Sequence, residues 1–263
     1  MLQSTSISNF HRDGFLSPVD IIDVQTAESH RRRLEQAESE FGPIHYKPKI
    51  YSLLTSPFKL ATQKKALDVV EDILGPDILL YNITYIIKEP HTPAHVSWHQ
   101  DLTYWGFDSD DQVSMWLALS PATLLSGCMM MIPGSHISGA MQHNMTDDAT
   151  NVLYSGQTVN KVDEGLAVAC ELEPGQASFH HGWTLHSSMP NKSDDRRIGL
   201  NVQFIAPHVR QTKHDGDSAY LVRGEDRFNH FEQDIVATSD LTKQGKVNLA
   251  FYEKRYKKIA GGK

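Results

Sequence analysis

The change from helical to strand periodicity occurs in residues 80–88, which read Leu80-Tyr81-Asn82-Ile83-Thr84-Tyr85-Ile86-Ile87-Lys88. Successive side chains of a strand point to opposite faces, so residues two apart share a face. The pattern predicts a strand with an apolar face made of Tyr81, Ile83, Tyr85 and Ile87. The other face is mixed and consists of Leu80, Asn82, Thr84, Ile86 and Lys88.

Helix formers dominate the sequence before this strand. Residues 26–40 and 66–74 each carry apolar side chains at helical spacing. The Thr-Ser-Pro run at 55–57 is typical of a helix start, and Gly75-Pro76 is typical of a helix end. We therefore expect a helical N-terminal part over about residues 1–76.

Short strand-like runs follow, separated by turns such as Pro133-Gly134 and Pro174-Gly175. They cover residues 96–103, 112–119, 128–132, 166–172, 176–181 and 197–206. Many short strands after a helical segment predict a mainly β fold with flanking helices, a jelly roll or barrel with the helices packed on one sheet.

The expected organisation is one domain over residues 1–263. Its core covers about residues 77–210, and a C-terminal extension covers about residues 211–263. The polar, irregular segment from about 138 to 164 is expected to be a lid, because long insertions in compact domains are more often functional than accidental.

Charge and composition limit the function classes. The net charge is −7 with histidine neutral, and no basic stripe is present, so we expect no nucleic-acid partner. No apolar run approaches the roughly 20 residues of a membrane span, so we expect no membrane partner. Cys128 and Cys170 lie in apolar runs and are expected to be buried free thiols, which fits a cytoplasmic setting.

The stretch Ser97-Trp98-His99-Gln100-Asp101 is the first part of a possible metal site. In a strand, His99 and Asp101 would aim an imidazole and a carboxylate at one point. Two histidines and one carboxylate leave open positions on a metal, which suits iron(II) oxygenases. A surface strand with two polar residues remains the alternative for this pair taken alone.

The third ligand is expected before the strand that begins at Arg197. His186 lies eleven residues before Arg197, and His180 and His181 are its rivals. On that strand Arg197, Asn201 and Gln203 share one face, while Ile198, Leu200, Val202 and Phe204 share the other. An inward arginine can grip a carboxylate with two parallel hydrogen bonds. Arg196 remains a rival to Arg197 if the strand begins later.

The chain resembles the phytanoyl-CoA dioxygenase family of 2-oxoglutarate/iron(II) oxygenases over roughly residues 9–210. The matching stretches are Trp98-His99-Gln100-Asp101-Leu102, Ile132-Pro133-Gly134-Ser135-His136, Glu173-Pro174-Gly175, and His186-Ser187-Ser188 through Asn191 to Arg197. They stand in the family's order with near-family spacing.

This resemblance implies a double-stranded β-helix, the cupin-like jelly roll. It places the Fe(II) ligands at His99, Asp101 and His186. The cosubstrate 2-oxoglutarate would lie against Arg197, Ser188, Trp116 and Asn82. The implied reaction consumes O2 and 2-oxoglutarate, releases succinate and carbon dioxide, and hydroxylates an unactivated C–H bond.

The substrate is expected to be a small molecule, such as an amino acid-like compound, an aminophosphonate or a natural-product intermediate. Candidate substrate contacts are Gln100, Asn201, Gln203 and Lys88, with Arg210 as a further polar group and His91 or His95 at the pocket mouth. His136, in a tight turn, is expected to be structural.

Three other functions remain as alternatives. A related halogenase is disfavoured because Asp101 is present, whereas those enzymes replace this carboxylate with Ala or Gly. A non-catalytic jelly-roll binding module would have no physical reason to keep three converging ligands. A zinc hydrolase would need no arginine for a cosubstrate. The oligomeric state is not predicted.

Overall fold

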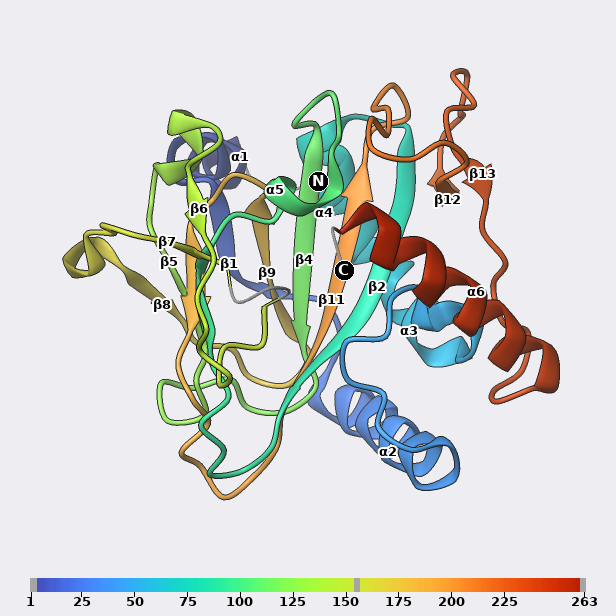
Figure 1. Cartoon of the computed structure of the whole chain (residues 1–263), viewed down its shortest axis with the longest axis horizontal. Helices are drawn as coiled ribbons and strands as arrows, with labels where there is room; N and C mark the ends of the chain where they lie inside the picture. The colour runs from blue at the N-terminus through green and yellow to red at the C-terminus, as the bar shows by residue number, and fades with distance from the viewer. Residues whose placement is uncertain (1–3, 154–156, 261–263) are drawn as a thin grey trace.

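The computed structural model describes residues 4–153 and 157–260 (Figure 1). Two antiparallel sheets form a jelly-roll core. The larger has the strand order β1-β9-β4-β11-β2-β12-β13, in which only the β12–β13 pair is parallel, and the smaller has the order β3-β10-β5-β8. The mainly β fold with a double-stranded β-helix core is therefore confirmed.

The strands of the larger sheet are β1 (Phe15–Asp20), β2 (Ile78–Lys88), β4 (Gln112–Ala118), β9 (Gln176–His181), β11 (Arg197–Ile205), β12 (Ser218–Arg223) and β13 (Glu232–Gln233). Those of the smaller sheet are β3 (Val96–His99), β5 (Met129–Met131), β8 (Val168–Cys170) and β10 (His186–Ser188). A separate pair is formed by β6 (His143–Asn144) and β7 (Thr158–Val159). The helices are α1 (Ser4–Asp13), α2 (Val24–Phe41), α3 (Thr55–Ala61), α4 (Lys64–Leu74), α5 (Leu102–Trp105) and α6 (Lys243–Ile259).

The main hydrophobic core lies between the larger sheet and the N-terminal helices. Leu34 of α2, Leu60 of α3 and Val70 of α4 belong to one buried cluster with the apolar face of β11. That face is Ile198, Leu200, Val202 and Phe204, as the alternation predicts. Burial of this face directs the opposite face of β11 toward the smaller sheet, and so sets which side chains can form a site.

Strand β2 departs from the predicted alternation at one point. The register with β11 shifts between Gln203, which pairs with Asn82, and Phe204, which pairs with Leu80. Tyr81 is the extra residue of a β-bulge, which reverses the parity on its N-terminal side. Leu80 therefore packs in the main core, and Tyr81 packs in a second cluster on the other face. The prediction was wrong for these two residues and correct for Ile83, Tyr85 and Ile87.

The N-terminal part is less uniformly helical than predicted. Strand β1 lies within it and pairs with β9 at the edge of the larger sheet. Thr62, the C-cap of α3, and Gln63, the N-cap of α4, separate the two helices that the sequence pattern joined. Gly75 ends α4 with a positive φ of 92°, a conformation that glycine adopts without strain.

The C-terminal extension is built into the core. Strand β12 pairs with β2, which widens the larger sheet. Behind it, the buried ammonium of Lys49 lies 2.7 Å from the carboxylate of Asp234 and also donates to the carbonyls of Tyr81 and Ser218. These contacts hold the extension against the loop that precedes α3. Among the described residues, no helix is both long and apolar enough to cross a bilayer.

Candidate active site

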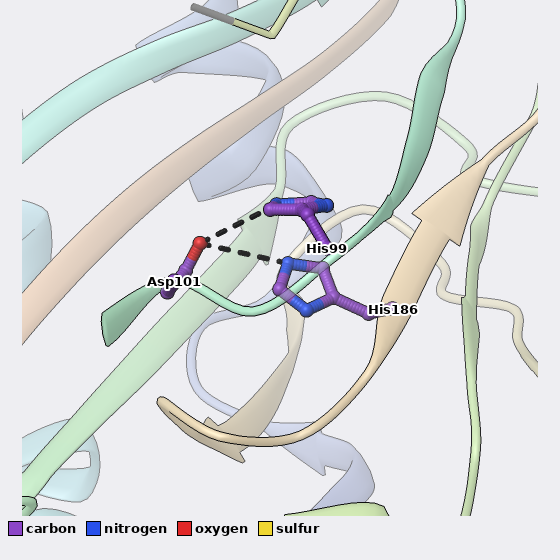
Figure 2. A group of neighbouring side chains, drawn as sticks. All are labelled: His99, Asp101 and His186. Atoms are coloured by element: carbon purple, nitrogen blue, oxygen red, sulfur yellow. Dashed lines mark ion pairs between the residues drawn. The ribbon is translucent and has the colours of Figure 1, made fainter. Parts of the chain in front are cut away.

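His99 and His186 face each other across two paired strands. In the smaller sheet His186 of β10 stands directly opposite His99 of β3, and their ring centroids are 4.0 Å apart. The Nε2 atoms of His99 and His186 lie 3.4 Å and 3.7 Å from Asp101 Oδ1 (Figure 2). One ligand atom from each of the three residues lies within 4.8 Å of the others, and all three side chains are buried. The structure thus brings together the three expected ligands.

Asp101 reaches this point by a different route from the one predicted. The strand ends at His99, and Asp101 is the N-cap of α5 with helical angles, φ −61° and ψ −44°. The expectation of a strand over 96–103 with Asp101 two positions along the same face was therefore wrong. The chain turns into a short helix instead, and this turn carries the carboxylate back over the two imidazoles.

Both histidines are oriented by their own strands. The Nδ1 atom of His99 donates to the carbonyl of Ser97 at 2.9 Å, and that of His186 donates to the carbonyl of Thr184 at 2.9 Å. Because a carbonyl only accepts, these bonds place a proton on Nδ1 of each ring, so Nε2, which lies toward Asp101, is the nitrogen available to a metal. Burial, with the nearby His99, holds the pKa of His186 well below its usual range, so the ring stays neutral.

The Asp101 carboxylate is oriented from its other side. Its Oδ2 atom accepts a hydrogen bond from Ser114 Oγ at 3.0 Å and lies 3.3 Å from His180 Nε2. Burial alone would raise the pKa of this carboxyl, but the hydrogen bond from His180 is the largest of the opposing effects, and together they hold the pKa well below its usual range. The carboxylate is therefore ionised, with Oδ1 directed toward the two histidines.

The two rival histidines, His180 and His181, lie outside the group of three candidate ligands. His180 contacts the carboxylate oxygen that points away from the His99–His186 pair, so it supports Asp101. His181 lies 3.8 Å from Asp110, and its Nδ1 accepts from the backbone of Trp183. Two imidazoles and one carboxylate, with the remaining side open to a cavity, are a donor set that suits Fe(II).

Arg197 is a buried cation without an anionic partner among the described residues. Its side chain is among the largest that are fully buried, and NH1 donates to the carbonyl of Gly127 at 3.1 Å. Its Nε has no hydrogen-bond partner in the described part of the chain. Burial lowers the pKa of Arg197 to about 10. A buried guanidinium with unused donors fits the distal carboxylate of 2-oxoglutarate.

Arg196 lies on the opposite face of the sheet. Its guanidinium contacts Glu38 of α2 at 2.8 Å and Glu89 at 2.8 Å. Arg197, Asn201 and Gln203 instead line the cavity between the sheets. The predicted facing of β11 is correct: Arg197 faces the cavity and Arg196 faces α2.

Trp116 and Ser188, the other expected cosubstrate contacts, both lie on the cavity wall. The Trp116 ring lies beside Arg197, with Cζ 4.9 Å from the ring centroid. Lys88 Nζ donates to Ser188 Oγ at 2.7 Å and to the Ser188 and Met189 carbonyls. Asn82 also lines the cavity, and its Oδ1 accepts from the backbone of Lys49 at 2.8 Å.

Two candidate substrate contacts, Gln100 and Lys88, are not among the cavity-lining residues. Gln100 is fully buried, and its amide donates to the carbonyls of Gly139 and Trp183 and accepts from the backbone of Met141. It therefore ties the insertion to the metal-site loop. Lys88 is buried among the carbonyls at the ends of β10. The polar atoms of both residues are thus already paired within the protein, which argues against either as a substrate contact.

Four other polar residues singled out in the sequence also lie off the cavity wall. His91 pairs with Asp194 at the surface, and His95 contacts Thr150 and lies 3.6 Å from Asp148. Arg210 bonds His230. His136 contacts the carbonyl of His11, which agrees with a structural role.

The cavity has a volume of about 700 Å³ and extends from the metal-site residues to the C-terminal helix. The insertion contributes Val152 and Leu153 to its wall, and α6, which crosses the strands β11 and β2 in Figure 1, contributes Tyr256. Tyr46 and Tyr104 complete this aromatic part. Sequence reasoning missed all three tyrosines, because they come from a loop, a single helical turn and the C-terminal helix, none of which carries a periodic signal linking it to the site.

The comparisons with known proteins agree with this geometry. A family model described as Phytanoyl-CoA dioxygenase (PhyH) matches residues 10–199. The chain is 28% identical over 149 residues to a probable alpha-ketoglutarate-dependent hypophosphite dioxygenase of Stutzerimonas stutzeri, covering 56% of this chain and 52% of that protein. It is 29% identical over 156 residues to the peroxisomal phytanoyl-CoA dioxygenase of Homo sapiens, covering 57% of this chain and 46% of that protein. The chain thus matches about half the length of these curated relatives.

Solved structures give the same result over more of the chain. The apo form of ThoJ, described as a non-heme monooxygenase, is 28% identical, with a TM-score of 0.84 and coverage of 97% of both chains. CytC3 with Fe(II) and alpha-ketoglutarate is 17% identical, with a TM-score of 0.67 over 92% of this chain and 95% of that one. The second likeness concerns the fold alone.

Proposed function

Because the chain belongs to the phytanoyl-CoA dioxygenase family, we propose that it is an Fe(II)- and 2-oxoglutarate-dependent dioxygenase that hydroxylates a C–H bond of a small molecule. The main support for the proposal is that three candidate metal ligands and a buried arginine line the same cavity. His99, Asp101 and His186 converge there, and the buried Arg197 offers unused donors. A metal site alone would suit several functions, whereas the unpartnered arginine calls for an anionic cosubstrate.

In this proposal His99, Asp101 and His186 hold Fe(II), and Arg197 with Ser188 holds the distal carboxylate of 2-oxoglutarate. Bound iron and 2-oxoglutarate would supply the activation of O2, coupled to decarboxylation of 2-oxoglutarate to succinate and carbon dioxide. Trp116 would limit how the cosubstrate chain lies, since its ring is fixed beside Arg197. Asn82 of β2 pairs with Gln203, six residues along β11 from Arg197, so it would lie beyond the cosubstrate chain, on the substrate side of the cavity.

The protein's other contribution is to keep the site ordered and dry. The imidazoles are fixed by the Ser97 and Thr184 carbonyls, and Asp101 is fixed by Ser114 and His180. Partners of this kind commonly change metal affinity or activity by about 10- to 100-fold. The insertion and α6 line the cavity and would limit the access of solvent to the metal-site residues.

The substrate is proposed to be a small molecule, without the acyl-CoA of the family's name. Among the charged residues lining the cavity, Lys47 is paired with Glu253 and Lys257 is exposed, so no cluster of free basic side chains is available for a coenzyme. Nucleic-acid and membrane partners are not proposed. Cys128 and Cys170 are buried free thiols, which supports the proposal of a cytoplasmic setting.

The test combines metal analysis with product measurement. Purified protein should bind one Fe(II) per chain and, with 2-oxoglutarate added, develop the charge-transfer absorbance of an iron–2-oxo acid chelate. A screen of small metabolites should then identify compounds that stimulate succinate release. A chain that binds Fe(II) and 2-oxoglutarate but releases no succinate with or without any metabolite would be a binding module.

A further inference from the structure

The metal-site end of the cavity carries buried polar atoms that neither the metal nor the cosubstrate uses. Gln203 is 2% exposed and lines the cavity, and its Oε1 atom has no hydrogen-bond partner among the described residues. The hydroxyl of Tyr104, on α5, is buried and equally unpartnered there. Leaving a buried polar group unpaired is costly, so these two atoms at the metal-site end of the cavity indicate a ligand that pairs with them.

Gln203 is too far along its strand to serve the cosubstrate anchor. It stands six residues after Arg197 on β11, which at about 3.3 Å per residue is roughly 20 Å. The five-carbon chain of 2-oxoglutarate has four carbon–carbon bonds of about 1.5 Å and spans at most about 6 Å. A cosubstrate held by Arg197 therefore ends well short of Gln203.

The same residue lies close to the metal-site carboxylate. Gln203 pairs with Ser114 of β4, and Ser114 donates to Asp101 at 3.0 Å. Gln203 is therefore at the end of the cavity where a substrate would meet the metal.

Tyr256 adds a second phenol to this end. Its oxygen accepts a hydrogen bond from Trp105 Nε1 at 2.9 Å, and no acceptor for its own O–H is found in the described part of the chain. The usual pKa of a phenol is about 10, so both hydroxyls are protonated donors at neutral pH.

No buried charged side chain among the described cavity-lining residues is left free for this subsite. Asp101 belongs to the metal site and Arg197 to the cosubstrate. Lys47 and Glu253, at 2.8 Å, neutralise each other, and Lys257 is exposed on α6. Around the polar atoms the wall is apolar, with Val96, Val152 and Leu153. A charged ligand group would lose its hydration here without gaining an opposite charge.

We propose that Gln203, Tyr104 and Tyr256 form the substrate-recognition subsite, and that it selects an uncharged polar group, an amide or a hydroxyl, attached to an apolar body. The group donates a hydrogen bond to Gln203 and accepts one from a phenol. This rests on the proposed function, since it assumes that Fe(II) and 2-oxoglutarate occupy the other end of the cavity. It assigns specificity to α5, α6 and β11 together.

The experiment measures binding without turnover. Protein loaded with Ni(II) and 2-oxoglutarate is titrated with four probes that share one cyclohexyl body, and each dissociation constant is measured by ligand-observed NMR. Two probes are neutral, cyclohexanecarboxamide and cyclohexylmethanol, and two are charged, cyclohexanecarboxylate and cyclohexylmethylammonium. The neutral probes should bind at least roughly tenfold more tightly than the charged ones.

Substitutions then locate the contact. Gln203→Leu and Tyr104→Phe should each weaken carboxamide binding by roughly threefold to tenfold, the range expected for one hydrogen bond, while 2-oxoglutarate affinity stays unchanged. Tyr220→Phe is the matched control, because Tyr220 packs against Phe58 away from the cavity and should alter neither affinity.

The possible failures are distinguishable. If Ni(II) and 2-oxoglutarate do not load, the proposed function fails and this inference fails with it. If they load, the proposed function stands. The inference alone is then overturned by tighter or equal binding of a charged probe, by no binding of any probe, or by unchanged carboxamide binding in both variants.

Discussion

The guanidinium carbon of Arg197 lies 4.9 Å from the centroid of the Trp116 ring. On the same face of β11, the residue between Arg197 and Asn201 is Gly199, which has no side chain. A Cβ atom at Gly199 would come within 1.9 Å of Trp116 Cζ2. The indole therefore occupies the space that a side chain on β11 would fill. The position of Trp116 therefore depends on Gly199 having no Cβ atom. The cavity wall beside Arg197 depends on it as well.

Gly199→Ala tests that dependence. The added methyl group should displace Trp116 and lower the free energy of unfolding by about 1–3 kcal/mol, as overpacking does in well-packed cores. The affinity for 2-oxoglutarate should fall as well. Denaturant unfolding and a 2-oxoglutarate titration measure the two effects. Gly165→Ala is the control, since its added Cβ would meet only a movable side-chain oxygen, Asp163 Oδ1 at 3.2 Å. Unchanged stability and affinity in Gly199→Ala would contradict the account.

Arg197→Ala should raise the apparent Michaelis constant for 2-oxoglutarate by roughly one to three orders of magnitude. Charge-assisted hydrogen bonds are worth about 1.5–3 kcal/mol each, and 1.4 kcal/mol is a tenfold change. Iron binding should remain nearly unchanged, since the residue is no ligand. Arg197→Lys should fall between, because lysine keeps the charge and loses the planar fork.

Arg196→Ala is the matched control for this strand. Its guanidinium contacts Glu38 and Glu89 on the other face, so its loss should leave the Michaelis constant nearly unaltered. A strong effect of Arg196→Ala with a mild effect of Arg197→Ala would show that the cosubstrate is held elsewhere.

Asp101→Ala should abolish hydroxylation and strongly weaken iron binding, because the metal loses its only charged ligand. Bound iron is measured directly in the purified variant, and succinate release is measured with saturating 2-oxoglutarate. Near wild-type turnover in this variant would remove Asp101 from the metal site.

His180→Ala should weaken metal binding by about 10- to 100-fold without abolishing it. His180 contacts Asp101 Oδ2, the carboxylate oxygen turned away from His99 and His186, and so orients the carboxylate. His180→Gln can still donate to that oxygen and should recover part of the affinity. His181→Ala, at the adjacent position, should have little effect. Complete loss of metal in His180→Ala, unrelieved in His180→Gln, would indicate that His180 is itself a ligand.

The insertion from about residue 138 to 164 is predicted to be a lid that is more mobile without substrate. Its residues 154–156 lie outside the described part of the chain. The described part is tied to the metal-site strand through Asn151, which accepts from the backbone of Ser97 at 3.4 Å, and its Val152 and Leu153 line the cavity. Hydrogen exchange should be faster in this segment than in the sheets and should slow when substrate binds. Equal protection without ligand would refute the lid.

Local pattern was sufficient for much of the fold. The alternation in β11 predicted which face meets the helices, because a strand with one fully apolar face has only one stable orientation against a core. Gly75-Pro76 predicted the end of α4 for an equally local reason. The bulge at Tyr81 was not predictable, because it depends on how β2 pairs with a strand more than a hundred residues later.

The sequence by itself determined the chemical groups of the candidate site and the strand facing that puts Arg197 inside and Arg196 outside. Those features depend on residue type and on a period of two, both of which are local. Only the tertiary structure decided that Asp101 joins the two histidines from a helical turn. It also decided that Gln100 and Lys88 donate their hydrogen bonds to backbone carbonyls. Finally, it placed Tyr46, Tyr104 and Tyr256 on the cavity wall. Each of these depends on a contact between segments far apart in the chain, and the free energy of such a contact depends on both partners. A local sequence pattern contains only one of the two partners.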